Sequence, residues 1–71
     1  MITPSELAKE YVAKLNNEIK GGKHVIYKGG EVKEIEIVEL VNKIKIHIIF
    51  NDGTEILIPP SVFLASKINI F

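Results

Sequence analysis

The side chains that could carry chemistry are few and scattered. Histidine occurs twice, at His24 and His47, and cysteine is absent, so disulfides, thiolate metal sites and cysteine nucleophiles are excluded. A two-histidine metal site needs carboxylate ligands at a defined spacing, and the sequence contains no HExxH-type pattern. We therefore expect both histidines to be structural or solvent-exposed, and we predict no metal, no cofactor and no catalytic constellation.

Two glycine pairs, Gly21-Gly22 and Gly29-Gly30, are the residues that a phosphate site would use. Neither pair lies in a GxxxxGK[ST] or GxGxxG context. A helix end at the first pair and a two-residue hairpin turn at the second account for all four glycines. The sequence thus predicts no small-molecule substrate and a protein that is not an enzyme.

Lysines are the other candidate binding residues. Nine lysines balance nine acidic residues and arginine is absent, so the chain has no general attraction for nucleic acid or anionic lipid. A local nucleic-acid patch is the alternative function, formed by lysines at hairpin ends with one aromatic ring for stacking. Its residues are Tyr27, Lys28, Lys33, Lys43 and Lys45. The other explanation, favoured by the missing arginine, is a solvated surface of mixed charge.

The element expected first is an N-terminal helix at about 4–20. Thr3 can cap it, Pro4 lacks only an N–H that a helix start does not use, and Glu6 falls at the capping-box position. Apolar residues recur through the segment at three- and four-residue spacing, which predicts one buried stripe. The first glycine pair is expected to end the helix.

The remainder, about 23–71, is expected to be mostly strand. Isoleucine and valine dominate it, and the apolar period changes to two. Strands are predicted at Lys23–Lys28, Glu31–Val41, Ile44–Phe50, Thr54–Ile58 and Lys67–Phe71, with a single helical turn over Ser61–Ala65. The second strand changes parity, so a bulge or bend is expected near Ile37-Val38 to keep its apolar residues inside.

Turn residues separate these strands. Turns are expected at Gly29-Gly30 and Asn42-Lys43, and a three-residue loop at Asn51-Asp52-Gly53, with the last glycine at positive φ. The run Ile48-Ile49-Phe50-Asn51-Asp52-Gly53-Thr54, followed by Ile58-Pro59-Pro60-Ser61, resembles the hairpin and Pro-Ser turn that close many SH3-like small barrels, the superfold of SH3, Tudor, KOW and Sm-like proteins.

This resemblance implies an α+β fold: an N-terminal helix followed by a five-stranded, mostly antiparallel SH3-like or Sm-like small barrel. The leading helix is similar to the one that Sm-like proteins carry. Where those proteins place an Asp-x-Met-Asn RNA motif, this chain has Val41-Asn42-Lys43-Ile44, so the resemblance does not imply a uridine pocket. We expect residues 1–71 to form a single domain.

Two apolar residues, Ile49 and Leu57, fall at strand positions that point away from the predicted core. Two explanations stay open: the N-terminal helix covers them, or they form a contact surface for another chain. The last strand is a second apolar candidate, because its edge carries no blunting charge. Its interface residues would be Ile68, Ile70 and Phe71.

These expectations favour a non-catalytic interaction module. We expect it to bind another protein or to form a homo-oligomer, since a chain of this length gains stability from a partner. No apolar run approaches the roughly 18 residues of a membrane span, and the N-terminus lacks the basic-then-apolar order of a signal peptide. We therefore expect a cytoplasmic protein without membrane contact.

Overall fold

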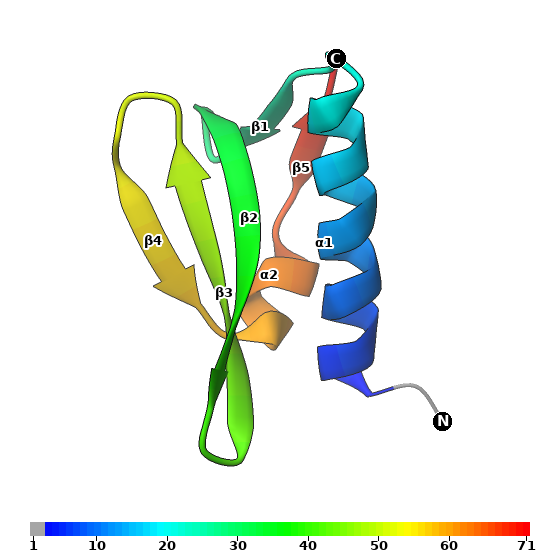
Figure 1. Ribbon diagram of the computed structural model, residues 1–71, viewed down its shortest axis with the longest axis vertical. Helices are drawn as coiled ribbons and strands as arrows, with labels where there is room; N and C mark the ends of the chain where they lie inside the picture. The colour runs from blue at the N-terminus through cyan, green and yellow to red at the C-terminus, as the bar shows by residue number, and fades with distance from the viewer. Residues whose placement is uncertain (1–2) are drawn as a thin grey trace.

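The predicted α+β class is confirmed by the computed structural model, which describes residues 3–71 (Figure 1). One long helix precedes five strands, and a short helix separates the last two. The elements are α1 (Pro4–Lys20), β1 (Val25–Tyr27), β2 (Gly30–Leu40), β3 (Lys43–Phe50), β4 (Glu55–Ile58), α2 (Pro60–Ala65) and β5 (Ile68–Ile70). Neither helix of this described part has the length and apolarity to cross a bilayer.

Helix α1 begins and ends where the sequence predicts. The backbone N–H of Glu6 donates to Oγ1 of Thr3 at 3.2 Å, which satisfies one of the unpaired donors of the first turn. At the other end, Gly22 has φ +95°, and the N–H of Lys23 donates to the carbonyl of Glu18 at 3.0 Å. This backbone pattern is a Schellman motif, and its positive φ is the reason that glycine stands there.

The five strands form one antiparallel sheet in the order β4-β3-β2-β1-β5. Strands β4 and β5 stand at the two ends of this order and do not pair with each other. The sheet is therefore open, and the predicted closure into a barrel is not confirmed. In Figure 1, β4 forms the edge of the molecule on the side away from α1.

The two hairpin turns next to β2 lie one residue earlier than predicted. Tyr27 pairs with Gly30, so the first turn is Lys28-Gly29 rather than Gly29-Gly30, with positive φ at both residues. Gly30 is needed for a different reason: a Cβ there would lie 2.9 Å from Cδ1 of Phe50. Its hydrogen side chain leaves room for the aromatic ring.

The second turn is Val41-Asn42 rather than Asn42-Lys43, because Leu40 pairs with Lys43. Of its two central residues only Asn42 has a positive φ, 67°, at the second central position, where a type II turn requires it. Asparagine tolerates this conformation far better than a β-branched residue does. The third loop is as predicted, with Gly53 at φ +92°.

The bulge in β2 lies between Val32 and Glu34, not near Ile37-Val38. Val32 and Ile35 are three residues apart and both are buried, which an unbroken strand of period two cannot achieve. After this one irregularity the alternation is regular. Val38 consequently stays on the side away from the core, opposite Lys45, so its predicted burial with Ile37 is wrong.

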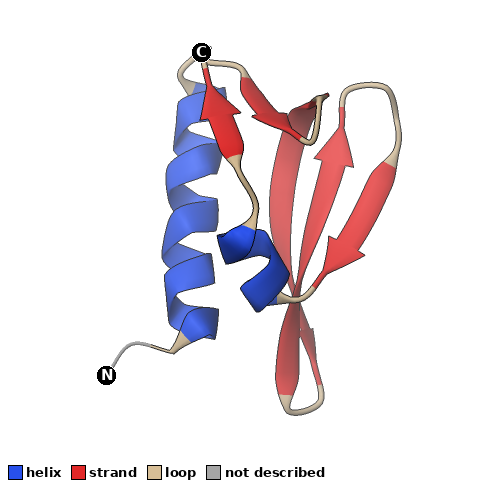
Figure 2. Cartoon of the chain, turned by 180° about the vertical axis from the view of Figure 1, so that it is seen from behind, coloured by secondary structure: helices blue, strands red, loops and turns tan. Residues whose placement is uncertain are grey.

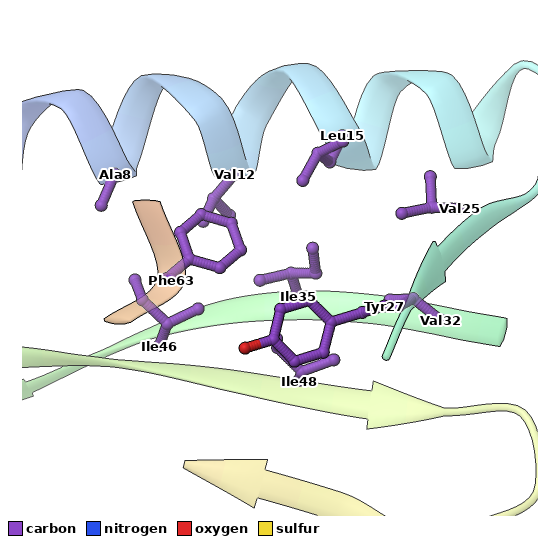
Figure 3. Packing of buried hydrophobic residues seen from close by; sticks show 10 residues of the cluster. All are labelled: Ala8, Val12, Leu15, Val25, Tyr27, Val32, Ile35, Ile46, Ile48 and Phe63. Atoms are coloured by element: carbon purple, nitrogen blue, oxygen red, sulfur yellow. The ribbon is translucent and has the colours of Figure 1, made fainter. Parts of the chain in front are cut away.

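The core lies between the sheet and the two helices (Figure 3). The apolar stripe of α1 meets inward-facing strand residues, and α2 contributes one aromatic ring. The buried residues are Ala8, Val12, Leu15, Val25, Tyr27, Val32, Ile35, Ile46, Ile48 and Phe63. Segment 60–65 is an α-helix rather than the single turn expected, because the full burial of Phe63 supplies tertiary packing that a six-residue helix lacks by itself.

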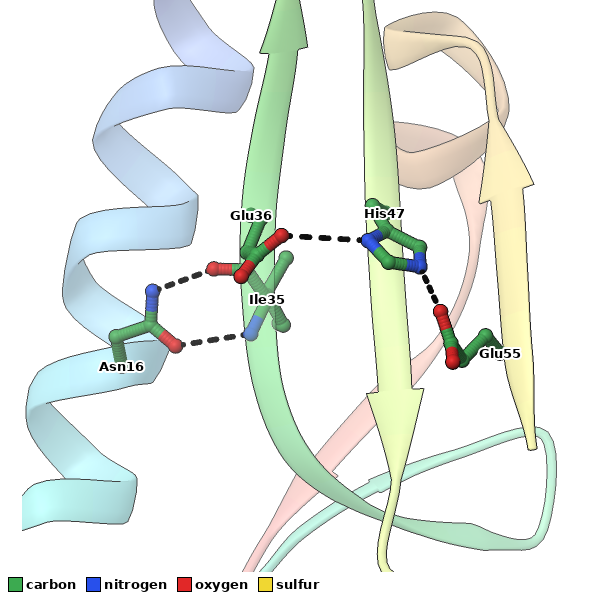
Figure 4. A network of polar contacts seen from close by, with 5 residues as sticks. All are labelled: Asn16, Ile35, Glu36, His47 and Glu55. Atoms are coloured by element: carbon green, nitrogen blue, oxygen red, sulfur yellow. Dashed lines mark hydrogen bonds and ion pairs between the residues drawn. The ribbon is translucent and has the colours of Figure 1, made fainter. Parts of the chain in front are cut away.

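Helix α1 also docks on the edge of β2. Within β2, only Gly30 and Glu31 pair with β1. On the side of β2 away from β3, the residues after the bulge therefore have no neighbouring strand. There the Asn16 amide takes the place of a strand: its Nδ2 donates to the carbonyl of Ile35 at 2.8 Å, and the Ile35 N–H donates to its Oδ1 at 3.1 Å (Figure 4). One side chain thereby satisfies both main-chain groups of Ile35.

Candidate interaction surface

The outer face is defined here as the side of β2, β3 and β4 that points away from the core. Because side chains alternate along a strand, the register determines its members. One row runs Glu34–Ile49–Glu55 across the three strands, and the next runs Glu36–His47–Leu57. The pairs Val38–Lys45 and Leu40–Lys43 complete the face.

Neither helix of residues 3–71 covers the outer face, since both pack on the core side together with Ile46 and Ile48. The explanation that the N-terminal helix covers Ile49 and Leu57 is therefore wrong, and the other, a contact surface for another chain, stays a prediction. Leu57 is 52% exposed, and Ile49 is half-buried between its strand neighbours. Both residues are therefore available to a partner, Leu57 more fully than Ile49.

His47 lies at the centre of the outer face between two carboxylates (Figure 4). Its Nδ1 is 3.3 Å from Oε2 of Glu36 on β2, and its Nε2 is 2.6 Å from Oε1 of Glu55 on β4. Desolvation of the partly buried ring lowers the pKa of His47, but hydrogen bonds to the two carboxylates, and their charges, outweigh it and leave the pKa raised. The sequence analysis missed both partners, because only the register places them beside the ring.

This cluster does not have the geometry of a metal site. The two carboxylates meet opposite nitrogens of one imidazole, so the three side chains do not converge on a single point. His24 lies elsewhere, with its Nδ1 2.5 Å from Oε2 of Glu31. Among residues 3–71, no group of three or more possible ligands is placed to hold a metal ion.

The His24–Glu31 pair is a local surface contact. A hydrogen bond from the His24 ring lowers the pKa of the Glu31 carboxyl; desolvation opposes it, and the charge of His24 and a hydrogen bond from Asn51 add to the lowering. Both side chains are well exposed. The pair joins the segment before β1 to β2.

The lysines of the nucleic-acid alternative do not gather in one place. Lys28 and Lys33 lie near the start of β2, while Lys43 and Lys45 lie beside its far end. Lys45 pairs with Val38, and at a rise of about 3.3 Å per residue the five steps from Lys33 to Val38 span roughly 17 Å, with Lys43 further still. Tyr27 is 1% exposed and its hydroxyl lies 2.8 Å from Oγ of Ser66, so this ring is not open for base stacking.

At the β5 edge, the side chains of Ile68 and Ile70 are half-buried and pack against the core, whereas Phe71 is 72% exposed. His24 and Phe71 exchange both main-chain hydrogen bonds across the β1–β5 pair. Because bonded pairs alternate in an antiparallel ladder, the N–H and C=O groups of Ile68 and Ile70 point to the opposite edge. The apolar side chains predicted for this interface are thus partly committed to the core.

The β4 edge has a different composition. The Phe50 N–H donates to the Thr54 carbonyl at 2.9 Å, which sets the phase of the β3–β4 ladder. Alternation then directs the main-chain groups of Glu55 and Leu57 away from β3, towards the open edge. The side chains of these same two residues lie on the outer face. An open hydrogen-bonding edge and an exposed apolar side chain therefore coincide at Leu57.

A shallow hollow of about 290 Å³ lies beside this edge. Its lining consists of Val38, His47, Glu55, Ile56 and Leu57.

Comparison with known proteins finds no matching family, no matching curated protein and no matching solved structure. The surface must therefore be interpreted from its own geometry.

Proposed function

We propose that this chain is a non-catalytic protein-association module that binds its partner through the outer face and the β4 edge. The observation that carries the proposal is the coincidence at Leu57 of unpaired main-chain groups with an apolar side chain that is half exposed. Strand addition at a sheet edge draws its affinity from main-chain hydrogen bonds and its specificity from alternate side chains. Both components are available at β4.

The sheet itself supports a relationship to the small-barrel superfold. Five antiparallel strands, a three-residue loop before β4 and a helical segment after Pro59 follow the pattern implied by the sequence resemblance. In this proposal the chain has the elements of a small barrel, but its sheet stays open because β4 and β5 do not pair. The unpaired β4 edge would then be its binding edge.

Protein is a better-supported partner than nucleic acid. The candidate lysines are divided between opposite ends of β2, and the stacking ring proposed for them is buried. A nucleic-acid site needs several cations close enough to follow one phosphate backbone. A gel shift with RNA and DNA at low salt tests the alternative, since a salt-sensitive shift at micromolar protein would restore it.

The first partner to test is a second copy of the chain. Sedimentation velocity from micromolar to millimolar protein should show a concentration-dependent increase in mass if copies associate through this surface. Leu57→Lys should abolish the increase, because an inserted charge blunts an open edge. Val41→Lys is the matched control, because Val41 is 87% exposed at the β2–β3 turn, away from this surface. A protein that stays monomeric throughout contradicts self-association.

A further inference from the structure

The chemistry of a β4 partner can be read from the register of the open edge. A strand added antiparallel to β4 forms its hydrogen bonds with Glu55 and Leu57. Side chains of a hydrogen-bonded pair lie on the same face, so the two partner residues opposite Glu55 and Leu57 both lie on the outer face. One of them meets a carboxylate and the other meets a leucine.

The charge of the outer face favours a cation in the first of these positions. Around His47 the outer face carries three carboxylates, at Glu34, Glu36 and Glu55, whereas its two lysines, Lys43 and Lys45, lie towards the start of β3, away from Glu55. The Oε1 atom of Glu55 faces His47, and its second oxygen leaves room for another donor. A lysine or arginine opposite Glu55 would form a cross-strand pair of opposite charge, and a branched apolar residue would cover Leu57.

A second copy cannot supply this combination from its own β4 edge. With Glu55 opposite Leu57 of the other copy, each carboxylate faces a leucine. With Glu55 opposite itself, like charges face each other. With Leu57 opposite itself, Glu55 faces Pro59, which has no N–H to donate. None of these antiparallel registers of β4 against β4 therefore places a cation opposite Glu55.

The β5 edge of a second copy is no better suited. Its bonding positions are Ile68 and Ile70, so an isoleucine would face Glu55. Both side chains also pack against the core of their own copy. The edges of this chain thus lack the side chains that its β4 edge favours.

We propose that β4 binds an extended segment of another protein with the pattern apolar-x-basic, read from N- to C-terminus and added antiparallel. The apolar residue lies on Leu57 and the basic residue pairs with Glu55. This inference rests on the proposed association function and specifies the partner class. It concerns a strand of another chain and does not require self-association.

The test is a titration of ¹⁵N-labelled protein with an acetylated and amidated peptide, Thr-Thr-Ile-Thr-Lys-Thr-Thr, followed by amide chemical shifts. Shifts should concentrate at residues 54–58 of the protein. The same peptide with Glu in place of Lys should bind about three- to fivefold more weakly, the range expected for a cross-strand charge pair. In Glu55→Lys the preference should reverse.

The matched control is Glu10→Lys, which changes the net charge by the same amount on an exposed position of α1. It should leave the preference for the lysine peptide unchanged. Equal binding of both peptides at β4 contradicts the partner class but leaves the association surface in place. Shifts at another site, or none at millimolar peptide, overturn the inference. A monomeric protein that also binds neither peptide overturns the proposed function as well.

Discussion

The two faces of the same three strands have opposite properties. On the inner face, Ile46 and Ile48 are fully buried beneath α1 and α2. On the outer face, His47 and Ile49 alternate with them along the strand and remain partly open. Successive residues of one strand thus serve different purposes: the inner residues provide stability, and the outer ones are free to carry charge and to contact a partner. The predictions below test that division.

The largest effect should come from truncating the inner face. Phe63→Ala removes the fully buried ring that anchors α2 against α1, where it lies 5.5 Å from the ring of Tyr11. We expect a loss of about 3–5 kcal/mol in the free energy of unfolding. Urea denaturation followed by circular dichroism measures it. Because this loss approaches the whole stability of a small domain, Ile48→Val, expected at about 0.5–1.5 kcal/mol, provides a milder variant that stays folded.

The second effect concerns the junction between α1 and β2. Asn16→Leu leaves the N–H and C=O of Ile35 without their partner at a partly buried edge, which should cost about 1–3 kcal/mol. Hydrogen exchange of the Ile35 amide should accelerate as well. Asn17→Leu at the exposed neighbouring position is the control. Equal losses in both variants would show that the amide does not act as a substitute strand.

The third prediction concerns pH. The pKa of His47 is raised in the folded protein, so its contribution to stability is fully present below the unfolded pKa of about 6.5 and is lost as the pH rises through the folded pKa. The stability difference between wild type and His47→Gln should therefore shrink from pH 6 towards pH 8, in urea titrations at each pH.

The cause of this shift can be tested by NMR titration of the imidazole. Glu55→Gln should lower the midpoint of His47, because it removes the negative charge beside Nε2 and leaves only a neutral amide oxygen, a weaker acceptor, in place of the carboxylate oxygen at 2.6 Å. Glu34→Gln, at an outer-face carboxylate without a hydrogen bond to this ring among the described residues, is the control. An unchanged midpoint in Glu55→Gln would contradict the assigned cause.

The smallest effect on stability should come from the outer face itself. Leu57→Lys replaces an exposed side chain and should change the free energy of unfolding by no more than about 0.5 kcal/mol. It should nevertheless remove partner binding. A loss of unfolding free energy comparable to that of Ile48→Val would show that Leu57 contributes to stability as the inner residues do. It would contradict the division between the two faces.

Local patterns predicted most of the elements correctly. Helix α1 has its predicted bounds because Thr3 and the first glycine pair act within a few residues of chain. The alternation at 44–50 likewise assigned the inner residues of β3. The first turn was displaced by one residue, because adjacent glycines are equivalent in sequence and only the clash of a Cβ at position 30 with Phe50 distinguishes their roles.

The bulge shows where local reasoning fails. The parity change was recognised, but it was placed to bury Val38, whereas burial of both Val32 and Ile35 requires the extra residue at the start of the strand. The position of the bulge depends on which residues of β2 the helix α1 covers, and that is set by contacts between residues far apart in the sequence. The same limit applies to the Asn16 amide, which bonds a residue nineteen positions away.

The α+β class, the ends of the long helix and the absence of thiol chemistry follow from the amino-acid sequence, because they depend on composition and on contacts within one or two turns. That the sheet stays open, that His47 lies between two carboxylates and that Leu57 is uncovered became known only from the folded chain. Each of these depends on strand register and on the side to which the helix packs, which are set by contacts between distant residues.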